Sequence, residues 1–213
     1  MPRAKSSLNV LFIGNSFAAR NNLPGMVATL AGAAGARMDH RLITAGGASL
    51  RMHWNKGEAQ RAIADGGYDY VVLQEQSTLP VKNAARMHEN VRLFHPVIEE
   101  AGAKTALYLT WARQHSPSTQ QAITGAYQSI GREIGATVVP VGVVWQRFLA
   151  EHDTPVLYDR DQGHPTLAGS YLAACVFFST LFDRSPVGID GKIEGLSPAE
   201  TKLLQRAASD NRI

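Results

Sequence analysis

The sequence has few of the residues that build disulfide frameworks or metal centres. Its one cysteine, Cys175, excludes an internal disulfide and a cysteine-rich zinc site. Neither a His-Glu-x-x-His nor a Cys-x-x-Cys pattern occurs, so metal catalysis has no support. Cys175 lies within the apolar residues 173–178, where a thiol is typically inert packing. We therefore predict no metal site.

Long hydrophobic runs and blocks of like charge are also absent. No stretch approaches the ~18–20 apolar residues of a membrane-spanning helix. The formal net charge of +3 is spread along the chain, so the sequence pI of about 9.1 is a weak argument for nucleic acid. We expect neither a membrane nor a nucleic acid as a partner, and composition leaves the oligomeric state open.

The chain has 213 residues, 45% of them hydrophobic and 18% charged, which is typical of one globular domain. We predict a single domain over residues 1–213, in which residues 185–213 form a C-terminal extension with a last helix. The basic N-terminus is followed by only a short apolar run within residues 8–13, which is continuous once past Asn9, whereas a signal peptide needs ~7–15 apolar residues. These residues favour a first strand and predict a cytoplasmic location.

Short apolar runs alternate with helix-like segments along the chain. Continuous runs suit strands that are buried on both faces of a parallel sheet, and they occur at residues 8–13, 71–73, 105–110 and 137–141. A weaker run at 38–45 is predicted to be an edge strand. Helices are predicted over residues 23–35, 57–65, 82–101, 118–134, 143–151 and 166–182, with a last one beginning after Ser197. The alternation predicts a doubly wound sheet, whose ligands bind at the carboxyl ends of the strands.

Polar residues follow the first strands at the positions where such a ligand would lie. Ser16 comes directly after the first strand, in a Gly-Asn-Ser turn that would expose its hydroxyl. Asp161 and His164 are three residues apart in a turn, where the carboxylate could fix the imidazole tautomer and leave Nε2 to act as a base. Each pattern alone is equally typical of a loop or a helix cap.

The segments after the second and third strands offer donors for a negatively charged oxygen. Gly46 and Gly47 can leave a backbone N–H bare, although Gly-Gly is more often an ordinary turn. Gln74, Glu75 and Gln76 follow a buried strand, so at least one side chain should point into the pocket. An amide N–H is a suitable donor to an oxyanion, whereas the alternative is a polar strand end that meets solvent.

The order of these segments resembles the SGNH (GDSL-type) hydrolase superfamily over residues 10–169, most of the chain. The match rests on Gly14-Asn15-Ser16, on Gly46-Gly47, and most closely on Asp161-Gln162-Gly163-His164. The chain departs from the family pattern in having Gly-Asn-Ser for Gly-Asp-Ser. In the third block Gln74-Glu75-Gln76-Ser77 replaces Gly-x-Asn-Asp, which resembles the carbohydrate-esterase branch.

The resemblance implies a three-layer α/β/α sandwich with about five parallel strands in the flavodoxin-like order 2-1-3-4-5. It implies that Ser16 is the nucleophile of a serine esterase acting on short-chain, mainly acetyl, esters, including those of carbohydrates, without a cofactor. The other implied catalytic residues are Asp161 and His164, and the implied oxyanion donors are the Ser16 and Gly47 N–H groups and the Gln76 amide, with Gln74 as the alternative. Asn15, Gln74, Glu75 and Trp111 are expected to contact substrate. The mouth of the site is expected to be lined by Trp111, Arg113 and Gln114 after the fourth strand and by His53 and Trp54 after the second, although core packing is an equal alternative for the two tryptophans.

Two other classes of function remain open. A flavodoxin-like protein could cradle a phosphate at Gly14-Asn15-Ser16, but that function leaves Asp161 and His164 without a role. A catalytically silent relative that binds a glycan or a protein partner would explain the altered first and third blocks. The intact serine, aspartate and histidine favour the esterase.

Overall fold

A computed structural model of the chain describes residues 6–191 and 193–209, and its framework is one parallel sheet. The sheet has five strands in the order β2-β1-β3-β4-β5, which confirms the predicted fold. The strands are β1 (Ser7–Gly14), β2 (Arg37–Thr44), β3 (Tyr70–Leu73), β4 (Lys104–Tyr108) and β5 (Thr137–Val139). All pairings are parallel, so the segments that follow the strands meet at one edge of the sheet.

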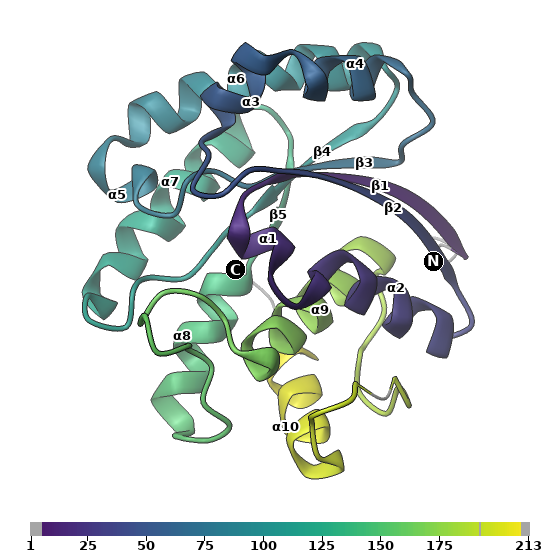
Figure 1. Ribbon diagram of the computed structural model, residues 1–213, viewed down its shortest axis with the longest axis vertical. Coiled ribbons are helices and arrows are strands. Elements are labelled where there is room, and N and C mark those ends of the chain that lie inside the picture. Colours follow the sequence, from purple (N-terminus) through teal and green to yellow (C-terminus); the bar gives the residue numbers. More distant parts are fainter. Residues whose placement is uncertain (1–5, 192, 210–213) are drawn as a thin grey trace.

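Helices cover both faces of the sheet, which gives three layers (Figure 1). One face carries α3 (Leu50–Lys56), α4 (Glu58–Ala64), α5 (Leu79–Lys82), α6 (Ala84–Glu100) and α7 (Gln120–Glu133). The other carries α1 (Ser16–Ala19), α2 (Leu23–Ala33), α8 (Val141–Glu151), α9 (Leu167–Phe182) and α10 (Pro198–Ser209). Two short 3-10 turns, Arg20–Asn22 and Pro117–Thr119, precede α2 and α7.

The continuous apolar run of β1 reflects burial on both faces. Val10 and Phe12 pack in the core beneath the sheet, and Leu11 and Ile13 pack in the core above it. All four side chains are fully buried. By contrast, β2 lies at the edge of the sheet, and most of its residues are exposed. Its interrupted hydrophobic pattern was therefore the correct signal for an edge strand.

Helix α9 forms the centre of the lower layer. Its side chains are buried on nearly every side, because the sheet and α2 cover part of it and α10 covers the rest. Leu204 and Ala208 of α10 are fully buried, and Gln205 Nε2 donates to the Tyr171 hydroxyl at 2.9 Å. The C-terminal extension thus packs on α9 and not on the sheet. Residues 210–213 of the predicted extension lie outside the described part.

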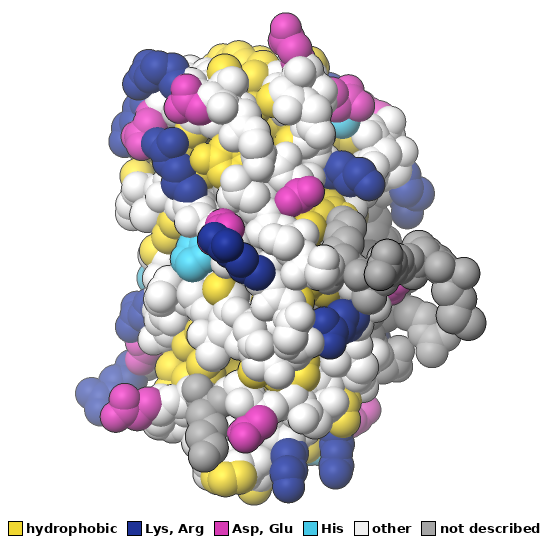
Figure 2. Space-filling model, turned by 90° about the vertical axis from the view of Figure 1, so that its right-hand side faces the viewer, with side chains coloured by type: hydrophobic (Ala, Val, Ile, Leu, Met, Phe, Trp, Pro, Cys, Tyr) yellow, Lys and Arg dark blue, Asp and Glu magenta, His cyan; other side chains and the backbone are white. Residues whose placement is uncertain are grey.

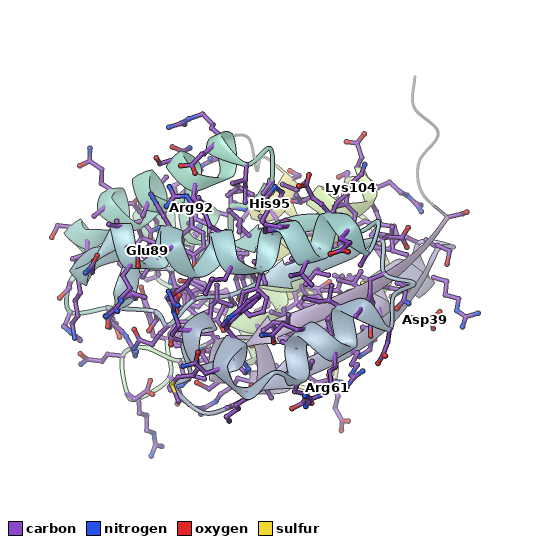
Figure 3. The ribbon with its side chains drawn as sticks, turned by 90° about the horizontal axis from the view of Figure 1, so that it is seen from above. Asp39, Arg61, Glu89, Arg92, His95 and Lys104 are labelled. Carbon is purple, nitrogen blue, oxygen red and sulfur yellow. The ribbon has the colours of Figure 1, made fainter. Side chains whose placement is uncertain are left out.

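The outer surface is charged without a block of one sign. Arg92 of α6 donates to the Glu133 carboxylate of α7 at 2.6 and 2.7 Å and so joins the two helices, with Glu89 and His95 also on α6 (Figure 3). Among the described residues of the face in Figure 2, basic and acidic side chains are interspersed. In the described residues, the helices fall short of the length and apolar character that a membrane crossing needs.

Three short helices, α1, α3 and α5, and two strand ends differ from the sequence prediction, and one of these ends is that of the run at 105–110, which stops as a strand at Tyr108. Ser49 caps α3 by accepting from the Met52 N–H at 3.3 Å, but the helix has only seven residues and follows a Gly-Gly turn, so its periodicity is too short to detect. In the run at 137–141 the strand ends at Val139, because Pro140 is the N-cap of α8 and Val141 is the first residue of that helix.

Candidate active site

Ser16 lies at the carboxyl end of β1, in the first turn of α1. Asn15 caps this helix, because its Oδ1 accepts from the Phe17 N–H at 3.1 Å. The Asn15 Nδ2 donates to the Ala48 carbonyl at 3.0 Å, in the loop that follows β2. The same buried side chain therefore shapes the serine turn and ties it to the neighbouring loop.

Asp161 and His164 lie in one tight turn just before α9. The Asp161 Oδ1 accepts from the backbone N–H groups of Gly163 at 3.0 Å and His164 at 2.8 Å. Its other oxygen, Oδ2, bonds the His164 Nδ1. The Trp111 indole N–H donates to the Gly163 carbonyl at 3.0 Å and holds this turn against the segment after β4. Carboxylate and indole together fix where the imidazole lies.

The fold brings Ser16 and His164 together across 148 residues of chain. Ser16 Oγ lies 2.7 Å from His164 Nε2, while His164 Nδ1 faces Asp161. With the Nδ1 proton donated to the carboxylate, Nε2 is free to accept the serine proton. The bond from His164 holds the pKa of the Asp161 carboxyl well below its usual range, and the two backbone N–H groups add to this effect. The carboxylate therefore remains ionised beside the imidazole.

Two backbone N–H groups near the serine are free to bind an oxyanion. Neither the Ser16 nor the Gly47 N–H has an acceptor within residues 6–191 and 193–209. Gly47 is exposed and has a φ of +63°, a conformation that glycine adopts without strain. A side chain at this position would be strained whatever space surrounds it. Both donors belong to the set implied by the resemblance.

The structure distinguishes the two glutamines of the third block. Gln74 is 1% exposed; its Oε1 accepts from the Asn15 N–H at 2.8 Å, and its Nε2 donates to the Glu75 carbonyl. Gln76 is partly exposed, and its Oε1 accepts from the Thr78 N–H and hydroxyl and from the Leu79 N–H. Its Nε2 has no acceptor in the described part of the chain. Gln76 is therefore the glutamine that is both partly exposed and unbonded at its amide N–H groups, whereas the buried Gln74 has one of its two N–H groups bonded.

The four residues expected to contact substrate are buried supports. Asn15, Gln74, Glu75 and Trp111 are between 0% and 3% exposed, so they support the site from within, and their contact with a substrate stays a prediction. The Glu75 carboxylate accepts from the N–H groups of Leu50 and Gln76 and from Asn90 Nδ2, and burial raises its pKa. Trp111 is stacked between the rings of Phe17 and Trp145, with ring centroids 4.9 and 3.9 Å away.

One further supporting residue is His53 of α3, which was predicted from the sequence to line the mouth of the site and which is buried in the structure. Its Nε2 lies 2.7 Å from the Gly14 carbonyl oxygen, and the ring is 3% exposed. Burial lowers the pKa of the imidazole, which keeps it neutral and lets Nε2–H donate to that carbonyl. Only the packing of α3 against the end of β1 shows that His53 supports the serine turn.

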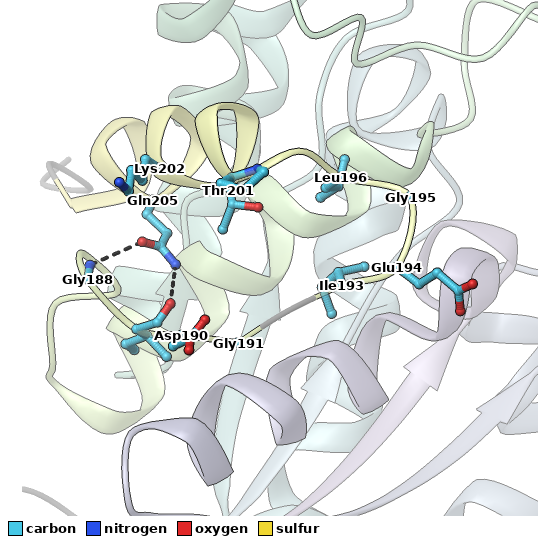
Figure 4. Close-up of a pocket in the computed structure, with 12 residues that line it drawn as sticks. Gly188, Asp190, Gly191, Ile193, Glu194, Gly195, Leu196, Thr201, Lys202 and Gln205 are labelled. Atoms are coloured by element: carbon cyan, nitrogen blue, oxygen red, sulfur yellow. Dashed lines mark hydrogen bonds between the residues drawn. The ribbon is translucent and has the colours of Figure 1, made fainter.

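A cavity of about 690 Å³ lies away from these residues (Figure 4). All of its described lining residues belong to the C-terminal extension, between Gly188 and Gln205, and Gln205 bonds the Gly188 N–H and the Ile189 carbonyl. None of its lining residues comes from the four sequence blocks. Within the described residues, no group of three or more His, Cys, Asp or Glu side chains is placed to hold a metal ion.

Comparison with family models and with curated proteins finds no match. Comparison with solved structures finds many, one of them a Slackia heliotrinireducens protein proposed to be an SGNH hydrolase. It is 27% identical with a TM-score of 0.72, over 82% of this chain and 99% of that one. A DUF4886 family protein from Bacteroides uniformis is 22% identical with a TM-score of 0.76, over 95% and 93% of the two chains.

An acetyl xylan esterase from Geobacillus stearothermophilus, carrying a Trp-to-Ile substitution, is 16% identical with a TM-score of 0.60, over 84% of this chain and 97% of that one. The order of the strands in the sheet agrees with these likenesses. The chain described here has the fold of the SGNH hydrolase superfamily, and its structural neighbours include ester-bond hydrolases.

Proposed function

We propose that this protein is a serine esterase that hydrolyses short-chain acyl esters, acetyl esters of carbohydrates in particular. The observation that carries the proposal is the chain of bonds from Ser16 Oγ through the His164 ring to the Asp161 carboxylate. A serine hydroxyl is a weak nucleophile until a base accepts its proton, and this arrangement supplies both the base and the group that orients it.

In the first half of the reaction, Ser16 Oγ attacks the ester carbonyl carbon while His164 Nε2 takes the serine proton. The carbonyl oxygen becomes an oxyanion, and the free N–H groups of Ser16 and Gly47 and the Gln76 amide are the donors we assign to it. His164 then gives the proton to the leaving alcohol, which departs and leaves the acyl group on Ser16.

In the second half, a water molecule attacks the acyl-serine carbonyl as His164 Nε2 accepts one of its protons. The same donors hold the second oxyanion, and the carboxylic acid leaves as Ser16 regains its proton. Asp161 stays ionised throughout and stabilises the imidazolium that forms twice in each cycle. Each step uses side chains and backbone groups of this chain only.

Two observations favour small acyl groups on a bulky alcohol. Ser16 and His164 are both partly exposed, so a large alcohol can remain outside while its ester reaches Oγ. The acetyl xylan esterase with the same fold acts on a polysaccharide ester according to its name. Together with the glutamine-containing third block, these observations support acetylated carbohydrate over lipid.

The test is hydrolysis of p-nitrophenyl acetate, butyrate and octanoate by the wild type and by Ser16→Ala. We expect a preference for acetate and a loss of at least about 10⁴-fold in kcat/KM in the variant, as for other triad serines. Ser129→Ala, an exposed serine on α7, is the matched control and should match the wild type. A fluorophosphonate should add to the wild type by intact mass but not to Ser16→Ala.

Equal activity of Ser16→Ala and the wild type would exclude the serine mechanism. An unlabelled wild type that also fails on acetylated xylan would leave the binding-only alternative as the better account.

A further inference from the structure

Arg113 brings an uncompensated positive charge to the junction of the three segments that form the candidate site. Its Nη2 donates to Ser77 Oγ at 3.0 Å, next to the third block, and its Cζ lies 5.3 Å from the centre of the Phe17 ring, next to the serine. A Cβ built on Gly163 would come within 1.6 Å of Nη1, so the guanidinium lies directly over the aspartate–histidine turn.

This position is close to the reacting atoms. Because consecutive Cα atoms are ~3.8 Å apart, Nη1 lies no more than roughly 7 Å from the His164 Cα. The centre of the His164 ring is 5.3 Å from that of Phe17, the same ring on which Arg113 lies. A substrate bound at Ser16 Oγ and His164 Nε2 would therefore have its neighbouring groups within reach of the guanidinium.

Arg113 lacks the partners that its neighbour has. Arg20, also near this turn, pairs with the Asp159 carboxylate. Among the described residues no carboxylate pairs with Arg113, and of its five N–H donors only one, on Nη2, is bonded. The side chain is half-buried, so it has lost part of its water without gaining an anion. A desolvated charge is normally paired with an opposite charge. In Arg113 the unpaired side of the guanidinium faces the candidate site.

We infer that Arg113 binds a carboxylate carried by the alcohol part of the substrate, so that the preferred ester is one of an acidic alcohol such as a uronic acid sugar. This inference rests on the proposed function and narrows its substrate class. The planar guanidinium offers two parallel N–H donors that match a carboxylate, and the Phe17 ring and Ser77 Oγ hold the plane in one orientation.

The test compares two acetyl esters that differ in one charge, 4-acetoxybenzoate and its neutral methyl ester. The measured quantity is the ratio of their kcat/KM values, anionic over neutral. In Arg113→Gln we expect this ratio to fall at least about tenfold, the effect of one lost charge-assisted bond of roughly 1.4 kcal/mol or more. Arg113→Lys keeps the positive charge but loses the two parallel N–H donors, so its ratio should lie between those of the wild type and Arg113→Gln. Added salt should lower the wild-type ratio towards that of Arg113→Gln.

Arg160→Gln is the matched control, because Arg160 is an exposed arginine in the same turn and the variant loses the same charge. It should keep the wild-type ratio. A second disruption, Gly163→Ala, places a methyl group where Nη1 lies and should lower the ratio as Arg113→Gln does. An unchanged ratio in Arg113→Gln, an equal loss on both esters, or an equal effect of Arg160→Gln would overturn the inference.

A binding measurement separates this inference from the proposed function. Calorimetric titration of Ser16→Ala with 4-acetoxybenzoate should show binding that weakens at least about tenfold when Arg113→Gln is added to it. Such binding without hydrolysis by the wild type would support the anion site and refute the esterase. Hydrolysis of both esters, with an anionic-over-neutral kcat/KM ratio that does not change in Arg113→Gln, would support the esterase and refute the anion site.

Discussion

His53 Nε2 lies 2.7 Å from the carbonyl oxygen of Gly14, two residues before the candidate nucleophile. This bond joins α3, which follows the Gly47 loop, to the end of β1, which carries Ser16. The Gly14 carbonyl also accepts from the Ala45 N–H at 3.4 Å. The serine turn and the loop of the second oxyanion donor are thus fixed to each other through one carbonyl oxygen.

We predict that His53 makes stability depend on pH. Burial lowers the pKa of this imidazole from its ordinary 6.5, so the unfolded chain binds a proton more readily than the folded one. The contribution is fully present above pH 6.5 and is lost as the pH falls from there through the lowered value. In His53→Gln the amide can still donate to Gly14 but does not titrate.

Urea unfolding of both proteins between pH 5 and 8 measures the effect. The free energy of unfolding of the wild type should fall relative to that of His53→Gln as the pH is lowered. His53→Leu, which removes the bond at neutral pH, should cost about 1 kcal/mol and should also lower kcat. A difference between wild type and His53→Gln that stays constant with pH would contradict a buried neutral imidazole.

Asp161 should stay ionised through the acid range of the pH–rate profile. Its carboxyl has a pKa well below the ordinary 3.8, because the charged form is bonded by His164 and two backbone N–H groups. The Asp161 carboxyl therefore adds no protonation step to the acid side of the profile above pH 4. A plot of log kcat/KM against pH should have a limiting acid slope of one, and a slope of two would contradict this assignment.

Asp161→Asn separates the charge from the shape of the turn. The asparagine Oδ1 can still accept from Gly163 and His164, so the thermal midpoint should change little. Its amide would face His164 Nδ1 and favour the wrong tautomer, and kcat should fall on the order of 10⁴-fold. A rise in KM alone, with kcat preserved, would show that Asp161 acts on substrate binding.

Gln76→Glu tests the side-chain donor of the oxyanion site. A glutamate keeps an oxygen that can accept from Thr78 and Leu79, so the local turn should hold. It replaces the free amide N–H with a negative oxygen, and kcat should fall about 10²–10³-fold with little change in KM. Gln74→Glu is the contrasting variant, because Gln74 is buried and bonded within the protein. It should lower the unfolding midpoint, and a Gln76→Glu enzyme of full activity would remove Gln76 from the site.

The sequence sufficed for the sheet because its strands are buried on both faces. The runs at 8–13 and 71–73 are apolar without alternation, and that pattern specifies a parallel strand between two helical layers. The candidate residues Ser16, Asp161 and His164 were suggested by the order of polar turns along the chain and by the resemblance that this order carries, because each turn alone is typical of an ordinary loop. The 2.7 Å distance between Ser16 Oγ and His164 Nε2 follows only from the fold.

The supporting role of the buried residues could not be predicted from the sequence, for a physical reason. A polar side chain at a strand end can face the ligand or bond another loop, and sequence does not distinguish the two. Gln74 and Glu75 bond to Asn15 and Leu50, partners 59 and 25 residues away, so their burial depends on contacts that no local pattern records. Trp111 was assigned to the mouth of the site on its position after β4, but its ring is enclosed by Phe17 and Trp145.

The stacked indoles of Trp111 and Trp145 give the protein an optical reporter of its candidate active site. Their ring centroids are 3.9 Å apart with planes 7° from parallel, close enough for their electronic transitions to couple. The Trp111 N–H also donates to the Gly163 carbonyl. The coupling between the two indoles therefore depends on whether the aspartate–histidine turn is packed against Trp111. Near-ultraviolet circular dichroism can therefore follow the assembly of this turn during refolding without a label, a substrate or any turnover.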